Sequence, residues 1–282
     1  MASFRFTILD VFTDTALAGN QLAVFTDARD IPEPMLQPLA REIGFSETVF
    51  VFRPEGDGHA RMRIFTPAVE LPFAGHPILG TAFVLASPLQ LIEIRLETPR
   101  ALVPVLLERD EGGRIVFGRM SQPLPTIDPY GEQEALLRAL GLERSELPIE
   151  VYDNGAQHVY VGLESPEAVA ALQPDLRQLA SFPDVGVNCF AGSGSEWKTR
   201  MFALGLGVGE DAATGSAAGP LALHLARHGR IRFGEEITIS QGAEIMRPST
   251  LYASVEGSVE DIRRVEVGGC AVIVARGDFH LT

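Results

Sequence analysis

The sequence predicts an α+β protein made of two similar halves, because it contains one internal repeat and many short strand-like stretches. In the first half, RMRIFT at residues 61–66 leads to ELPFAGHPILGTA at residues 70–82. In the second half, TRMFA at residues 199–203 leads to EDAATGSAAGPLA at residues 210–222. Each copy runs from an apolar strand into an acidic loop, with a glycine five residues after the glutamate, and then into a small-residue helix. The shared order and spacing favour a duplication over a chance likeness of two Gly/Ala-rich loops.

The other elements follow the same order in each half. Residues 14–25 and 153–163 each run from a Gly/Asn turn into a strand-like segment, followed by helices at 34–43 and 166–172 and strands at 48–52 and 185–190. Further strands are expected at residues 91–97, 102–108, 114–120, 236–241, 251–255 and 265–267, and further helices at 130–140 and 217–228. The Pro-rich stretch 122–129 suggests two domains, 1–125 and 126–282, with a last strand at 271–276 that belongs to either half.

Composition and charge narrow the functional class. The formal net charge of −14 disfavours nucleic acid and anionic membrane surfaces as partners, although local dipoles can still hold a small anion. The N-terminus lacks a secretory signal pattern, and no apolar run reaches the roughly 20 residues of a membrane helix. Cys189 and Cys270 lie far apart without C-x-x-C spacing, which is typical of structural thiols in a reducing compartment. We therefore expect a cytoplasmic protein that acts on a small molecule.

The two repeated loops contain the first candidate residues. Pro77 suits the first position inside a helix, which makes His76 the expected N-cap residue and lets Gly75 approach a ligand closely. Gly215 and Ser216 open the second helix in the same way. A helix N-terminus carries unpaired N–H groups and about half a positive charge, so two such starts could bind a carboxylate. From spacing alone, simple capping roles explain His76 and Ser216 equally well.

Two carboxylates likewise have both a catalytic and a purely structural explanation. Glu47 begins the segment ETVFVF and shares a strand face with Val49 and Val51. A carboxylate at the end of an apolar face suits a general acid/base, but an exposed glutamate at a strand start gives the same pattern. Asp211 is either a site residue or a loop charge at a helix start.

Other chemical motifs are weak or missing. His224 and His228 stand four residues apart, but residue 225 is Leu, so the H-E-x-x-H zinc signature fails. With Arg227 and Arg230 they are typical of a basic helix C-terminus, and we expect no metal site. The sequence also lacks the glycine-rich nucleotide loops and the G-x-S-x-G elbow of hydrolases.

The two repeated loops together resemble those of the phenazine biosynthesis PhzF family. The resemblance extends through GNQLAVF (19–25), FSETVFVF (45–52) and NGAQHVYVGL (154–163) and covers nearly the whole chain. It implies the diaminopimelate-epimerase-like fold, with two pseudo-symmetric halves, each a central helix wrapped by strands, and an active site between them. It also implies a homodimeric isomerase that shifts a proton on a small anionic ring substrate without a cofactor. A family member acting on another small acid, and a non-catalytic binding protein, are the alternatives.

The resemblance assigns roles to individual residues. Glu47, His76 and Asp211 correspond to the family's catalytic residues, and Ser216, Gly75 and Gly215 to its substrate contacts. In epimerases of this fold, cysteines precede the two glycines, whereas here those positions hold Ala74 and Thr214. A two-thiol racemase mechanism is therefore excluded, and Glu47 is expected to carry the proton.

Overall fold

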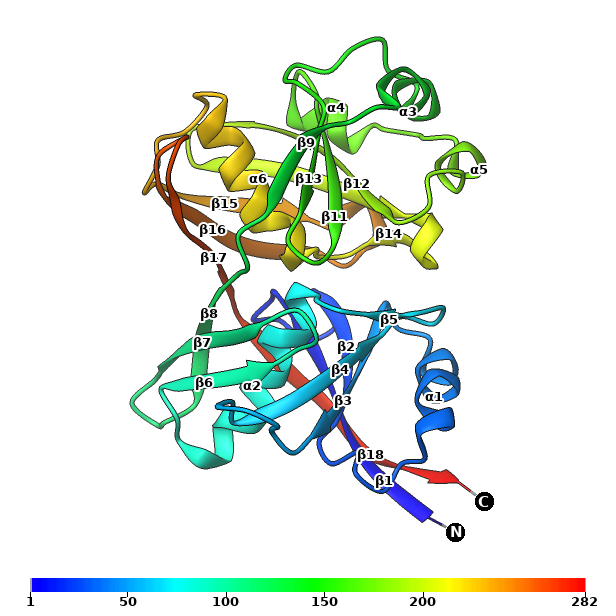
Figure 1. Cartoon of the computed structure of the whole chain (residues 1–282), viewed down its shortest axis with the longest axis vertical. Coiled ribbons are helices and arrows are strands. Elements are labelled where there is room, and N and C mark those ends of the chain that lie inside the picture. Colours follow the sequence, from blue (N-terminus) through cyan, green and yellow to red (C-terminus); the bar gives the residue numbers. More distant parts are fainter. Residues whose placement is uncertain (1, 282) are drawn as a thin grey trace. The chain divides into compact units, whose positions relative to one another are not determined.

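The computed structural model describes residues 2–281 and divides the chain into two compact units (Figure 1). Unit 1 contains the residues up to Ser121 together with those from Gly268 onward, and unit 2 contains Gln122–Val267. Each unit is a mixed sheet around one central helix, which confirms the α+β class expected from the sequence. Among the helices of residues 2–281, none combines the length and the apolar character needed to span a membrane.

Unit 1 begins and ends with paired strands. Its strands are β1 (Ala2–Val11), β2 (Asn20–Phe25), β3 (Glu47–Phe52), β4 (Ala60–Phe65), β5 (Glu70–Leu71), β6 (Glu93–Glu97), β7 (Leu102–Arg109), β8 (Ile115–Ser121) and β18 (Ala271–Leu281). Its helices are the 3₁₀ turn η1 (Glu33–Met35), α1 (Leu36–Ile43) and α2 (Gly75–Leu89). The last strand pairs antiparallel with the first along its whole length, so the chain's final segment completes unit 1.

Unit 2 contains the remaining elements. Its strands are β9 (Thr126–Pro129), β10 (Glu150–Asp153), β11 (Gln157–Gly162), β12 (Val185–Ser193), β13 (Glu196–Ala203), β14 (Val208–Asp211), β15 (Glu236–Gln241), β16 (Ser249–Gly257) and β17 (Ile262–Gly269), whose last two residues fall in unit 1. Its helices are α3 (Gln133–Leu140), α4 (Pro166–Ala170), α5 (Leu176–Leu179), α6 (Gly215–Arg227) and the 3₁₀ turns η2 (Leu204–Leu206) and η3 (Ala243–Ile245). Strand β9 pairs with β10 in unit 2, as β18 pairs with β1 in unit 1.

The two units share one strand topology. In unit 1, β1/β2 is antiparallel, β2/β3 parallel, β3/β4 antiparallel, β4/β6 parallel and β6/β7 antiparallel. In unit 2, β10/β11, β11/β12, β12/β13, β13/β15 and β15/β16 follow the same alternation. The short strands β5 and β14 pair at corresponding places on β4 and β13. The duplication inferred from the loops therefore extends through the whole topology.

The repeated arginine and glutamate explain why both acidic loops adopt the same course. In unit 1, Arg63 donates two hydrogen bonds to the Glu70 carboxylate, at 2.7 and 2.6 Å. In unit 2, Arg200 binds Glu210 in the same forked way at 2.8 and 2.7 Å. A paired fork of this kind fixes both groups in one orientation. Glu70 and Glu210 therefore anchor the loops that lead into α2 and α6.

The central helices are buried on nearly every side. The residues of α6 up to Ala226 are buried, and so are those of α2 from Gly75 to Phe83. Such helices are apolar all round and rich in small residues, so strands can approach them closely. A methyl group added at Gly80 would lie 2.6 Å from Leu22 and 2.9 Å from Val11, which shows how tightly α2 fits its sheet.

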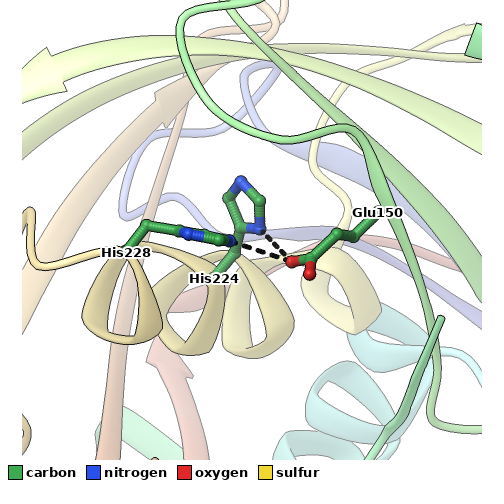
Figure 2. Close-up of side chains that lie close together, drawn as sticks. All are labelled: Glu150, His224 and His228. Atoms are coloured by element: carbon green, nitrogen blue, oxygen red, sulfur yellow. Dashed lines mark hydrogen bonds and ion pairs between the residues drawn. The ribbon is translucent and has the colours of Figure 1, made fainter. Parts of the chain in front are cut away.

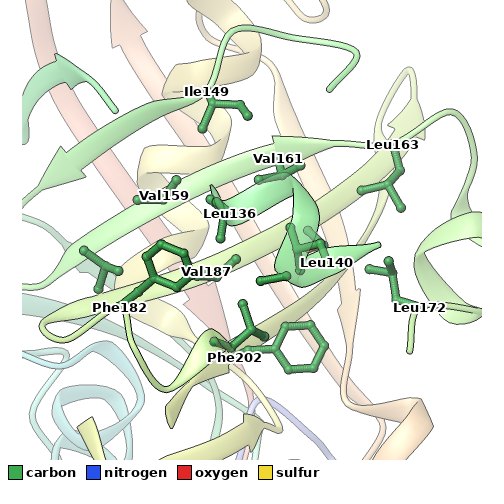
Figure 3. Close-up of a cluster of buried hydrophobic side chains, with 14 of the residues drawn as sticks. Leu136, Leu140, Ile149, Val159, Val161, Leu163, Leu172, Phe182, Val187 and Phe202 are labelled. Carbon is green, nitrogen blue, oxygen red and sulfur yellow. The ribbon is translucent and has the colours of Figure 1, made fainter. Parts of the chain in front are cut away.

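A separate apolar cluster lies under the smaller helices of unit 2 (Figure 3). Leu136 and Leu140 of α3 belong to it, together with Val159 and Val161 of β11 and Phe202 of β13. The α3 side chains recur at a spacing of four, so one face of this short helix is buried. This cluster stabilises the strands that carry the residues described below.

Several expected boundaries differ from those observed. The helix predicted at 130–140 begins only at Gln133, and before it the backbone N–H of Tyr130 is bonded to Ile149 O, next to the β9/β10 pairing. The helix predicted at 217–228 begins two residues earlier, at Gly215. Strand β18 continues five residues beyond the predicted 271–276, and its partner β1 was not among the predicted strands.

Candidate active site

The starts of α2 and α6 lie at equivalent places in the two units. The N-cap of α2 is Ala74, whose backbone is extended, so Gly75 is the first helical residue and His76 the second. The N-cap of α6 is Thr214, followed by Gly215 and Ser216. The expected N-cap role of His76 is therefore wrong, because Pro77 is accommodated deeper in the first turn, where its missing N–H costs nothing.

Glu47 and His76 meet inside unit 1. Glu47 Oε2 lies 3.3 Å from His76 Nε2, and the two side chains are 11% and 3% exposed. Strand β3 positions the glutamate at its first residue, and the second residue of α2 supplies the histidine. The reading of Glu47 as an exposed strand-start glutamate is therefore wrong. A buried carboxylate beside an imidazole is a common arrangement for proton transfer.

Further contacts hold the histidine ring. Asn20 Nδ2 lies 3.3 Å from His76 Nδ1, and Asn20 Oδ1 accepts a hydrogen bond from the Ser46 hydroxyl at 3.0 Å. Burial lowers the pKa of His76 to about 3, although a backbone hydrogen bond with Gln21 opposes the shift. The imidazole is therefore neutral at pH 7, and any charge on the Glu47–His76 pair belongs to the Glu47 carboxyl group.

In unit 2, Asp211 belongs to a compact polar cluster before α6. Its Oδ2 accepts a hydrogen bond of 2.6 Å from the Thr214 hydroxyl. Gln241 donates to Thr214 Oγ1 and to the backbone oxygen of Asp211, each at 2.9 Å, and accepts from the Thr214 N–H at 3.1 Å. All three side chains are buried. Gln241 therefore fixes the loop that presents Asp211, a role that the sequence analysis missed.

Ser216 is held at both of its oxygens. Its Oγ lies 3.0 Å from Nε2 of His158, and its backbone carbonyl accepts from Asn154 Nδ2 at 2.9 Å. The carbonyl needs this outside donor because Pro220, four residues later, has no N–H to give. The sequence analysis singled out neither Asn154 nor His158, because in the turn-and-strand segment 154–163 neither belongs to a chemical motif.

The glycines Gly75 and Gly215 occupy the first helical positions. Gln122 donates to the Gly215 carbonyl at 2.8 Å, and the N–H groups of a first helical turn have no partners within the helix. The structure thus brings Glu47 and His76 together in unit 1 and places Asp211, Gly215 and Ser216 around the start of α6 in unit 2.

His224 and His228 meet a partner that the sequence did not reveal, Glu150 (Figure 2). Glu150 Oε2 lies 3.3 Å from His224 Nδ1 and 3.0 Å from His228 Nε2. The same oxygen accepts from Arg227 at 2.8 Å and from the Tyr152 hydroxyl at 3.0 Å. Burial raises the pKa of Glu150, but these hydrogen bonds outweigh it and hold the pKa below its usual range. The Arg227 guanidinium already neutralises the Glu150 carboxylate. Since Arg227, His224 and His228 all lie at the end of α6, we infer that Glu150 anchors the C-terminus of this helix.

The cysteines are remote from these groups in the sequence and differ in burial. Cys189 is fully buried, and burial raises the pKa of its thiol to about 12. Cys270 is partly buried, and burial likewise raises its pKa. Ala74 and Thr214 occupy the positions before the two glycines, so these loops offer no thiol.

Comparison with known proteins identifies the family. The family described as phenazine biosynthesis-like protein (PhzC-PhzF) matches residues 9–277. This chain belongs to that family. A relative from Pseudomonas aeruginosa, named trans-2,3-dihydro-3-hydroxyanthranilate isomerase, is 52% identical over 277 residues, which cover 98% of this chain and 99% of the relative.

Solved structures share the fold of this chain. A PhzF-family phenazine biosynthesis protein from Bacillus anthracis superimposes with a TM-score of 0.85 at 25% identity and covers both chains completely. A probable proline racemase from Agrobacterium radiobacter superimposes with a TM-score of 0.67 at 12% identity, covering 99% of this chain and 93% of the racemase chain. The PhzF-family chain therefore has a fold that also occurs in a racemase.

Proposed function

We propose that the protein is a trans-2,3-dihydro-3-hydroxyanthranilate isomerase of phenazine biosynthesis, with Glu47 as its general acid/base. The observation that carries the proposal is the buried contact of Glu47 Oε2 with His76 Nε2 at the start of α2. The 52% identical relative that bears this name supports the choice of substrate. The protein is an isomerase, and the remaining assignments concern how its residues perform the reaction.

In the proposed reaction, the Glu47 carboxylate takes the proton from C3 of the substrate. The electrons of that C–H bond enter the conjugated diene and spread toward the ring carboxylate. The Glu47 carboxyl group then returns the proton to C1, and the enol formed becomes a ketone. Glu47 ends as the carboxylate, so neither a net proton nor an electron is exchanged with the protein. Burial of Glu47 favours return of the proton to the substrate over loss to water.

Neutral residues stabilise the charge that develops in this reaction. His76 is uncharged at pH 7 and stabilises the negative charge that develops on the substrate through a hydrogen bond. It does so without adding a full positive charge to an acidic protein. The first-turn N–H groups at Gly75 and Gly215 favour the substrate carboxylate. We assign Asp211 to the amino group of the substrate and to its orientation, and Ser216 to hydrogen bonding of a substrate oxygen. The contacts of both side chains support these assignments, because buried neighbours hold Asp211 and Ser216 in place.

The test is to incubate the purified protein with trans-2,3-dihydro-3-hydroxyanthranilic acid and to follow its consumption by proton NMR. The native protein should consume the acid, and Glu93→Gln, which alters a glutamate about half exposed on β6, should do so at the native rate. If native protein leaves the acid unchanged, the substrate assignment is wrong. Turnover of a different small carboxylic acid would then favour another isomerase function for the same residues.

We also propose, from the family resemblance, that the protein is a cytoplasmic homodimer. Free cysteines such as Cys189 and Cys270 are typical of proteins in a reducing compartment. Light scattering should give twice the 30.5 kDa of one chain, and a mass equal to one chain would contradict the dimer.

A further inference from the structure

His158 stands where unit 1 has an apolar residue, and this difference suggests a role. When GNQ at residues 19–21 is aligned with GAQ at residues 155–157, Leu22 corresponds to His158. In the parallel ladders, Leu22 pairs with Glu47, whereas His158 pairs with Gly186. A methyl group added at Gly186 would lie 2.9 Å from His158 Nδ1. Unit 2 therefore has a glycine in place of the acid/base and a histidine filling the space beside it.

The ring of His158 is placed between two polar side chains. Its Nε2 lies 3.0 Å from Ser216 Oγ, and its Nδ1 lies 3.4 Å from Nδ2 of Asn188. All three residues are buried. The imidazole itself is 2% exposed, so its protons are directed by these neighbours and not by bulk water.

The orientation of the Asn188 amide settles which ring nitrogen carries the proton. Asn188 Nδ2 donates to the backbone oxygen of Gly186 at 2.9 Å and approaches that of Val159 at 3.4 Å. Rotating the amide would place its oxygen against those carbonyls. An NH₂ group therefore faces His158 Nδ1, which must be the unprotonated nitrogen. Burial lowers the pKa of His158 to about 4, opposed by the charge of Asp153, so the neutral ring has its proton on Nε2.

We propose that His158 is a positioning residue that donates its Nε2–H to Ser216 Oγ and thereby directs the Ser216 hydroxyl proton toward an oxygen of the substrate. A serine hydroxyl has one proton. When its oxygen accepts from His158, that proton is available to an acceptor outside the pair. The inference rests on the proposed function, in which Ser216 binds substrate, and it adds that Ser216 acts as a donor to an anionic or carbonyl oxygen.

The test combines kinetics with the tautomer of the ring. In His158→Leu, which introduces the residue found at the corresponding position of unit 1, the KM for the dihydro-hydroxyanthranilic acid should rise about tenfold, with a smaller change in kcat. His158→Gln, whose amide can place a donor near Ser216, should restore most of the lost affinity. In a Ser216→Ala background, His158→Leu should cause no further change. Proton–nitrogen NMR of the substrate-free native protein should show the His158 proton on Nε2.

Different outcomes overturn different claims. A proton on Nδ1 refutes the inference even if His158→Leu does not fold. An equal effect of His158→Leu with and without the Ser216 hydroxyl, or no recovery in His158→Gln, shows that His158 acts only through packing. A KM unchanged in Ser216→Ala also refutes it. By contrast, a native protein that does not convert the acid refutes the proposed function, while the tautomer can still be measured.

Discussion

The Ser216 carbonyl offers a sharp test of how a proline is tolerated inside α6. Pro220 cannot donate to this carbonyl, and Asn154 Nδ2 supplies the bond at 2.9 Å from a fully buried side chain. In Asn154→Ala the carbonyl loses its donor in a buried site. Leaving a buried acceptor unpaired costs about 1–3 kcal/mol, so unit 2 should lose stability of that size.

Pro220→Ala provides the matched rescue. Alanine restores an N–H four residues after Ser216, where an α-helix needs it. Asn154→Ala should then cost about 1–2 kcal/mol less in the Pro220→Ala background than in the native one. Gln178→Ala, which removes an exposed side chain of the same unit, should cost the same in both backgrounds.

The assay is urea unfolding followed by tryptophan fluorescence. The chain has one tryptophan, Trp197, which lies buried in unit 2 and therefore reports on that unit. The free energies of unfolding of the native protein, the two single variants and the double variant give the coupling between positions 154 and 220. If Asn154→Ala costs the same with proline and with alanine at position 220, the missing N–H is not the reason for Asn154, and the reasoning is refuted.

Three further predictions concern titration and thiols. Because the pKa of the buried His158 is lowered from 6.5 to about 4, the free energy of unfolding should fall by up to about 1.4 kcal/mol per pH unit as the pH drops from 6.5 toward 4. His158→Gln should reduce this slope in unfolding followed by Trp197 fluorescence. The pKa of Glu150 is also lowered, so Glu150→Gln should destabilise unit 2 at pH 7 and lose this difference as the pH falls below about 4.5; a constant difference would contradict it. Alkylating reagents should leave activity unchanged and modify Cys189 only on unfolding, whereas a two-thiol mechanism requires inactivation.

The fold could be predicted from the sequence because its signals are local. The two glutamate-to-glycine spacings mark the loops, and the small-residue runs mark α2 and α6, whose burial follows from their apolar composition. The starts of the helices were harder to predict. Pro77 fits any position in a first turn, so it did not identify Ala74 as the N-cap residue of α2. The first strand was not predicted, and its alternation of apolar and polar residues changes phase between Ile8 and Leu9, where its pairing with β18 also shifts register.

The candidate site divides in the same way. Glu47 and His76 came from the family resemblance, and their contact depends on the register of β3 with β2, which no local pattern shows. His158 and Glu150 were not predicted, because their partners Ser216 and His224 lie more than fifty residues away in the chain. Such pairs become visible only when strands and helices are packed together.

The central claim is that Glu47 moves the proton, and the most direct test is the turnover of the dihydro-hydroxyanthranilic acid by Glu47→Gln. Glutamine keeps the size of the side chain but cannot accept the C3 proton. We expect kcat to fall by about 10²–10⁴, while substrate binding measured by calorimetry changes little and Glu93→Gln stays at the native rate. A Glu47→Gln protein that is folded and retains its native kcat would contradict the account.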